Sequence, residues 1–171
     1  PEQRPGGERC TGAWGAPPMR AFAYQLFHGI VQTADTIALM SEEVNPLRVI
    51  HMDGQSRPDV IRTLEGHSIG HWEGDTLVVE TNHFARATSF GNSSENMHLL
   101  EKFWMIDADT LGYEFTITDS TTWEAPWTVM FPMRRAELPM YEYACHEGNY
   151  AMAGILGGWR RLEALGLPGQ Q

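Results

Sequence analysis

Histidine and acidic side chains are the groups through which this sequence could carry out acid–base or metal chemistry. It contains seven histidines. His51 and Asp53 lie two positions apart, so on a β-strand they share one face at roughly 7 Å. With a third group from a neighbouring strand they could form an acid–base pair or two ligands of one metal ion. The simpler interpretation is a histidine at a strand end, bonded to a carbonyl group or to water.

His67 and His71 have the four-residue spacing that places two imidazoles on one face of a helix. Their surroundings, rich in glycine and followed by the turn at Gly74-Asp75, predict a strand instead. On a strand the two rings lie roughly 13 Å apart, so they cannot share one ion. His67 remains a candidate by itself.

Glu80 and His98 are the remaining acid–base candidates. Alternation in the strand 76–84 leaves both faces mixed, so Glu80 points either inward, where burial would raise its pKa, or into solvent. His98 aligns with Leu100 and Trp104, which predicts an inward position at the mouth of a barrel. A loop-edge histidine in solvent is the alternative.

Three Asp-Thr units organise the chain into hairpins. Each follows a small residue and separates two β-rich runs, which predicts the pairs 24–33 with 36–42, 67–73 with 76–84 and 98–107 with 110–119. Further single strands are expected at 47–52, 127–135 and 140–146. About nine short strands without long crossovers predict an all-β fold, an antiparallel up-and-down β-barrel of the lipocalin-like kind with eight to ten strands. A β-sandwich is the second choice.

The two ends of the chain differ from this middle region. Residues 1–20 form an irregular arm rich in Pro and Gly, 21–150 form the barrel domain, and 151–171 form a short helix and tail. Apolar residues at three-residue steps give the helix one apolar face (Leu156, Trp159, Leu162 and Leu165). We expect this face to pack on the outside of the barrel or to plug one end. Cys10 and Cys145 either form one disulfide bridge that ties the arm to the last strand or are two unrelated thiols.

Composition excludes several classes of protein. The 171 residues are 42% hydrophobic, and 22 Asp and Glu against 12 Lys and Arg give a net charge of −10. This charge would repel phosphate, so we expect no nucleic-acid partner and no binding to an anionic membrane. No apolar run approaches the roughly 20 residues of a membrane-spanning helix. The nucleotide-binding and hydrolase motifs are missing from the sequence, so no organic cofactor is expected, whereas a divalent metal remains an option.

The candidate site combines these residues. We expect His51, His67 and Glu80 to converge at one end of the barrel beneath the loop 54–66, either as acid–base groups together with His98 or as ligands of a divalent metal. Aromatic side chains on or beside the strands are candidates for binding the substrate (Trp72, Trp104 and Tyr143).

Five segments resemble a family of bacterial proteins that is frequent in acidobacterial and proteobacterial genomes and usually exported. They are 50–54, 66–70, 72–81, 103–118 and 145–150. The resemblance covers about residues 24 to 155. It implies a periplasmic or secreted location and a β-rich fold, and it transfers no functional residue.

Three functions follow as hypotheses. The first is an enzyme of lyase, isomerase or hydrolase type that acts on a small apolar or aromatic molecule in the barrel cavity with acid–base side chains. The second is a metal-dependent version of it. The third is a non-catalytic carrier of a hydrophobic ligand. An oligomer is not predicted.

Overall fold

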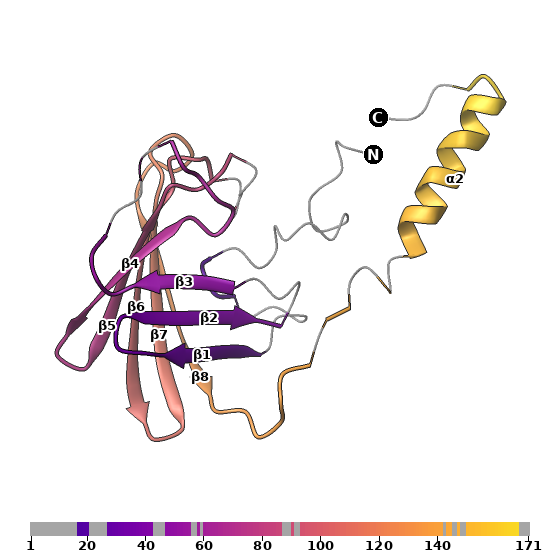
Figure 1. Ribbon diagram of the computed structural model, residues 1–171. Helices are drawn as coiled ribbons and strands as arrows, with labels where there is room; N and C mark the ends of the chain where they lie inside the picture. Colours follow the sequence, from indigo (N-terminus) through magenta and orange to yellow (C-terminus); the bar gives the residue numbers. More distant parts are fainter. Residues whose placement is uncertain are drawn as a thin grey trace.

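The fold is mostly β, with eight strands in one sheet. The computed structural model describes residues 17–20, 27–42, 47–55, 58, 60–86, 90, 93–141, 143–144, 147 and 150–167. The strands are β1 (His28–Gln32), β2 (Thr36–Ser41), β3 (Leu47–His51), β4 (His67–Glu73), β5 (Thr76–Asn82), β6 (His98–Asp107), β7 (Thr110–Thr118) and β8 (Trp127–Arg134). They follow one another in chain order across the sheet, which curls into a half-barrel (Figure 1).

The three predicted hairpins are confirmed. β1 pairs antiparallel with β2, β4 with β5 and β6 with β7. Gly74 adopts a φ of 60° in the turn between β4 and β5, a conformation that glycine adopts without strain. The predicted single strands at 47–52 and 127–135 are present as β3 and β8.

The junction between β3 and β4 departs from the predicted up-and-down order. These two strands are parallel, and they overlap at only two residue pairs, Ile50 with Ser68 and His51 with Ile69. The start of β4 therefore lies beside the end of β3. The sheet consists of two antiparallel parts, β1–β3 and β4–β8. In Figure 1 the first part runs across the direction of the second. The sheet order ends at β1 and β8, which do not pair with each other, so the predicted closure is not found among the described strands.

The predicted strand at 140–146 is wrong for the residues that the structure describes there. Met140, Tyr141 and Ala144 belong to no strand, and the chain leaves the sheet after β8. Pro132 lies within β8. Because proline has no N–H to donate to a ladder, it suits an edge strand that carries no further neighbour.

Helix α2 (Tyr150–Ala164) confirms the predicted C-terminal helix. It ends at Gly166, whose φ is 65°, where Gly166 N–H donates to Glu163 O and Leu167 N–H donates to Leu162 O. This is the hydrogen-bond pattern of a Schellman C-cap. None of its residues is buried, and it stands apart from the sheet in Figure 1, so the expected packing against the barrel is not observed. Within the described part of the chain, no helix has the length and apolar character needed to cross a membrane.

The core occupies the concave side of the sheet, where aromatic and aliphatic side chains from β2 to β7 are buried. In β3 the buried residues are Arg48 and Ile50, whereas Leu47 and Val49 are exposed. In β6 they are Leu99, Glu101 and Phe103. The predicted inward orientation of His98 is therefore wrong, because it lies on the opposite face of β6 from Leu99, Glu101 and Phe103. His51 likewise lies on the opposite face of β3 from Arg48 and Ile50.

Candidate functional site

A network of buried polar side chains lies at the centre of the concave face. Arg48 Nη1 donates to Glu101 Oε1 at 2.9 Å, and Nη2 pairs with Glu101 Oε2. Arg48 Nε donates to Ser68 Oγ at 2.8 Å, and Nη2 also donates to Thr81 Oγ1 at 2.7 Å. The Tyr113 hydroxyl donates to Glu101 Oε1 at 2.7 Å. The network thus joins β3, β4, β5, β6 and β7.

Burial and pairing set the electrostatics of this network. Burial disfavours the charged guanidinium of Arg48, but the facing Glu101 carboxylate more than offsets this and raises the pKa of Arg48. Burial, with the nearby Glu101 carboxylate, raises the pKa of the Tyr113 hydroxyl well above its ordinary value. Arg48 is therefore charged and Tyr113 neutral over the physiological pH range, and each group is held by its partners.

The segment 17–20 packs over this network. Pro17, Pro18 and Met19 are buried, and Met19 N–H donates to the Tyr113 oxygen at 2.9 Å. The guanidinium of Arg20 lies 5.3 Å from the centre of the Phe90 ring, which is cation–π geometry. The network is thereby sealed from solvent by the chain itself, and we assign it a structural role.

His51 and His67 lie together, as expected. Their ring centres are 5.0 Å apart, and the ring of His83 lies 6.3 Å from that of His67. His67 is buried, and its Nε2–H donates to the carbonyl of Gln55 at 2.8 Å. The three rings lie at the start of β4 beside Gln55, on the convex side of the sheet. His83 was not predicted, although it directly follows Asn82, the residue of β5 that pairs with His67.

Glu80 does not join these histidines. It pairs with Ile69 in the β4–β5 ladder, close to the register expected for it, but its side chain is exposed on the convex face. Its Oε2 lies 3.4 Å from Nε2 of His98, which is partly exposed. The structure therefore brings the four predicted catalytic residues together as two separate pairs, His51 with His67 and Glu80 with His98.

The predicted metal set is not assembled either. Among the described residues, no group of three or more His, Cys, Asp and Glu side chains has the arrangement needed to hold a metal ion. Cys10 and Cys145, the predicted disulfide pair, lie outside the described residues.

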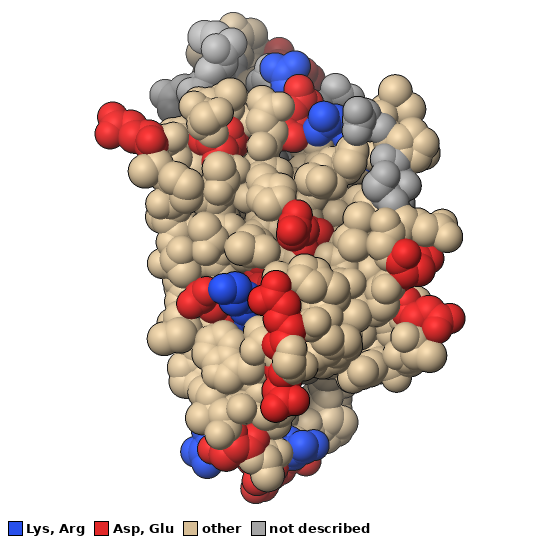
Figure 2. Space-filling view, turned by 90° about the vertical axis from the view of Figure 1, so that its left-hand side faces the viewer, with Lys and Arg blue, Asp and Glu red and all other residues tan. Residues whose placement is uncertain are grey.

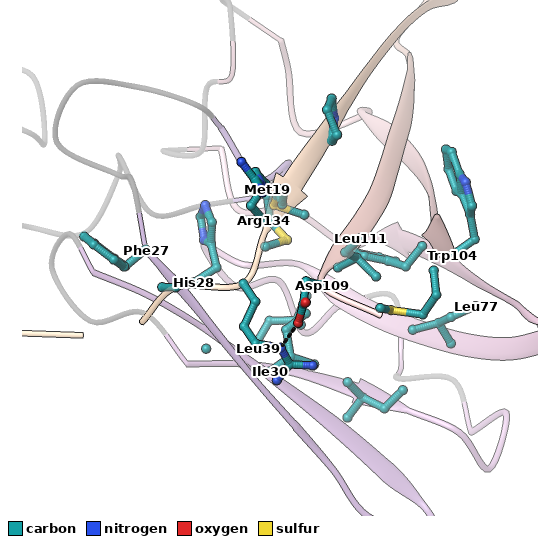
Figure 3. Close-up of a pocket in the computed structure, with 18 of the residues that line it drawn as sticks. Met19, Phe27, His28, Ile30, Leu39, Leu77, Trp104, Asp109, Leu111 and Arg134 are labelled. Atoms are coloured by element: carbon teal, nitrogen blue, oxygen red, sulfur yellow. Dashed lines mark hydrogen bonds and ion pairs between the residues drawn. The ribbon is translucent and has the colours of Figure 1, made fainter. Parts of the chain in front are cut away.

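A hollow of about 960 Å³ opens on the concave side (Figure 3). It lies between β1 and β2 on one side and the tips of the β4–β5 and β6–β7 hairpins with the end of β8 on the other. Most of its lining is aliphatic, aromatic or methionine side chains; those that belong to β1, β2, β5, β6, β7 and β8 are Ile30, Ile37, Leu39, Leu77, Phe103, Trp104, Met105, Leu111, Phe131 and Met133. This composition and volume are typical of small-molecule sites.

The predicted substrate-binding aromatics divide between the hollow and the rest of the molecule. Trp72 and Trp104 both contribute to its lining. The ring of Trp104 lies against Gly112, where an added Cβ would come within 2.3 Å of it. Tyr143 lies outside the eight strands and is not among the residues around the hollow.

His28 is a polar group in the wall of the hollow that was not predicted. Its Nδ1 lies 3.0 Å from Ser41 Oγ across the β1–β2 ladder, and the ring also bonds to the backbone of Arg20. Burial lowers the pKa of His28 against the opposing effects of Arg20 and of the nearby Glu42 carboxylate. The imidazole is therefore neutral at neutral pH. Its alternation with Ile30 in the predicted strand 24–33 was the signal that could have placed it inward.

Comparisons with known proteins found nothing similar: no protein-family model, no curated protein and no solved structure matches this chain. The geometry of the hollow therefore carries the functional conclusion by itself.

Proposed function

We propose that the protein binds a small, largely apolar molecule in the concave hollow of its half-barrel, and that it acts as a carrier. The observation that supports this is the hollow itself, about 960 Å³ in volume and lined mainly by apolar side chains. Sites for small molecules have volumes of roughly 300 to 1,000 Å³ and similar linings.

Three features of the lining favour binding over simple packing. Ile30 and Met105 in the wall are about half exposed, so apolar surface is left open to a ligand. Covering each 100 Å² of such surface gains about 2.5 kcal/mol. The methionines adapt to ligands of irregular shape, because their side chains are unbranched and flexible. The rigid sheet and its buried polar network hold the walls in place, which limits the ordering cost of binding.

The carrier is favoured over the acid–base enzyme by the positions of the predicted catalytic groups. His51 and His67 lie together beside Gln55, and Glu80 and His98 lie on the convex face, so none of the four lines the hollow. Lipocalin-type barrels also bind their ligands inside a curled β-sheet. We propose that this protein is lipocalin-like in that respect. A periplasmic or secreted carrier is in keeping with the family resemblance.

A catalytic function has one observation in its favour. His28 lines the hollow as a neutral imidazole, the form that accepts a proton. In that case His28→Gln should remove turnover and leave ligand affinity within about twofold, because Gln keeps a polar side chain at this position.

The proposal is tested by titrating the purified protein with N-phenyl-1-naphthylamine, a neutral apolar probe that fluoresces in apolar surroundings. Met133→Trp fills the hollow and should weaken binding at least tenfold. Met130→Trp is the matched control, because Met130 lies on the same strand but is exposed on the convex face. Equal binding by both variants and the parent protein would overturn the proposal.

A further inference from the structure

The charged residues around the hollow differ in balance from the chain as a whole. The chain carries 22 acidic and 12 basic residues, and acidic side chains predominate on the face shown in Figure 2. Among the described residues that line the hollow the basic ones outnumber the acidic ones: Arg20, Arg134 and Arg135 against Asp75 and Asp109. The charge balance of this described lining is therefore opposite to that of the chain as a whole.

One of the two acidic side chains at the mouth is already neutralised. Arg135 Nε donates to Asp109 Oδ1 at 3.0 Å, and Arg135 Nη2 donates to the Ala108 carbonyl at 3.3 Å (Figure 3). Asp75 lies in the turn between β4 and β5 and is exposed to solvent. Of the described arginines that line the hollow, Arg135 is therefore engaged with Asp109.

Arg134 is the arginine best placed to meet a ligand. It is exposed, lies at the end of β8 and lines the hollow. Within the part of the chain that the structure describes, its side chain makes no hydrogen bond and no ion pair. Its charge helps to lower the pKa of Asp107, as a minor contributor after the hydrogen bonds from the Asp109 backbone and from the Thr110 side chain.

We propose that the ligand of the hollow is an apolar molecule with one carboxylate group, its apolar part inside the hollow and its carboxylate beside Arg134. This inference rests on the proposed binding function. The planar guanidinium of arginine matches a carboxylate with two parallel hydrogen bonds. Because Arg134 is at the solvent-exposed mouth, the carboxylate can pair with it without leaving water, so the desolvation cost of a buried ion pair does not arise.

The test compares three molecules that differ only in the head group: dodecanoate, dodecanol and dodecylamine. Each is titrated as a competitor of the bound naphthylamine probe, below its micelle-forming concentration. Dodecanoate should bind about threefold to fivefold more tightly than dodecanol, the range of a solvent-exposed ion pair. Dodecylamine should bind more weakly than dodecanol. Salt at about 0.5 M should remove most of the difference between dodecanoate and dodecanol, because exposed charges are screened.

Two variants assign the preference to a residue. Arg134→Gln should reduce the dodecanoate preference to near one, because it weakens dodecanoate binding much more than dodecanol binding. Arg86→Gln, at an exposed position away from the hollow, should retain the preference.

The outcomes separate the two proposals. Equal binding of dodecanoate and dodecanol, a preference for the amine, or an undiminished preference in Arg134→Gln would overturn the inference and leave the binding function standing. Failure of all three molecules and of the probe to bind would overturn the proposed function itself.

Discussion

Arg48 and Glu101 face each other as an ion pair at the centre of the sheet, although 53 positions separate them in the sequence and both are buried. Their strands are not neighbours, since β4 and β5 lie between β3 and β6. Moving two charges out of water is costly, and the pair offsets that cost only where every remaining donor and acceptor is satisfied. Ser68, Thr81 and Tyr113 supply those partners. A slip of one residue in either strand would turn its charge to the convex face and leave the other buried without a partner.

Replacement of Glu101 should therefore be severe. We expect Glu101→Gln to lower the free energy of unfolding by about 3–5 kcal/mol, because it leaves the charge of Arg48 buried without a counter-ion. Urea unfolding measures the loss. Glu114→Gln, on the neighbouring strand and in a 4.0 Å pair with the partly exposed Lys102, is the control and should cost under about 1 kcal/mol. Similar losses in the two variants would contradict the assignment.

The stability of the protein should depend on pH through His28. Its pKa in the folded chain lies below the value of about 6.5 in the unfolded chain, so the unfolded chain takes up a proton first as the pH falls. The stability that depends on neutral His28 is therefore present above about pH 6.5 and is lost as the pH falls through the lower folded-state pKa. Melting temperatures between pH 7.5 and 5.5 should decline less in His28→Gln than in the parent protein. The exposed His71 provides the control variant, His71→Gln, which should keep the parent slope; an unchanged slope in His28→Gln would refute the prediction.

Asp119 should stabilise the turn after β7 at neutral pH. Burial opposes its charged form, but hydrogen bonds from Thr121 and Ser94 outweigh this and hold the pKa of the carboxyl well below its usual range. We expect Asp119→Asn to lower the free energy of unfolding by about 2 kcal/mol at pH 7. Since the folded-state pKa is lowered, this contribution is present above the unfolded value of about 3.9 and is lost as the pH falls below it. Chemical unfolding at pH 7 and pH 3 checks this, with the exposed Asp53→Asn as control. A difference that persists undiminished at pH 3 would contradict it.

Gly112 should be intolerant of a side chain. A Cβ at this position would lie 2.3–2.6 Å from atoms of the Trp104 ring, so Gly112→Ala must displace the ring or the strand. We expect a loss of about 1–3 kcal/mol, together with a change in the near-ultraviolet circular dichroism of the tryptophans. In α2 the corresponding Gly158→Ala has open space around it and should raise helicity. If Gly112→Ala leaves both the spectrum and the stability unchanged, the packing of Trp104 is different from that described.

The hairpins were predictable from the sequence because their turns carry local signals. Aspartate and glycine at the turns, with β-branched residues after them, predict paired strands whatever the rest of the chain does. Which face of β3 and of β6 points toward the core was not predictable in this way. Arg48 and Glu101 each violate the rule that charged residues lie outside, and alternation by itself assigns both to the surface. Both residues are assigned to the interior only when it is known that they pair with each other across the two intervening strands.

The candidate site shows the same division. The proximity of His51 and His67 was predicted from the loop that joins their strands, and it is confirmed, although the two strands are parallel and not antiparallel. The hollow could not be located from sequence, since its walls come from residues between Met19 and Met140. Its shape depends on the angle between the two parts of the sheet, which no local pattern encodes.

The short parallel overlap between β3 and β4 bears on how the protein opens. Only two residue pairs connect β1–β3 to β4–β8 through the backbone, so separation of the first three strands as a unit would break few backbone hydrogen bonds, together with those of the Arg48 side chain to Ser68, Thr81 and Glu101. Such a unit has its own opening free energy, below that of global unfolding, and is visible in native-state hydrogen exchange. Amides of β2 should then exchange together and sooner than those of β6 and β7. Because β1 and β2 form one wall of the hollow, a bound ligand would slow their exchange, and its release would be limited by the same opening.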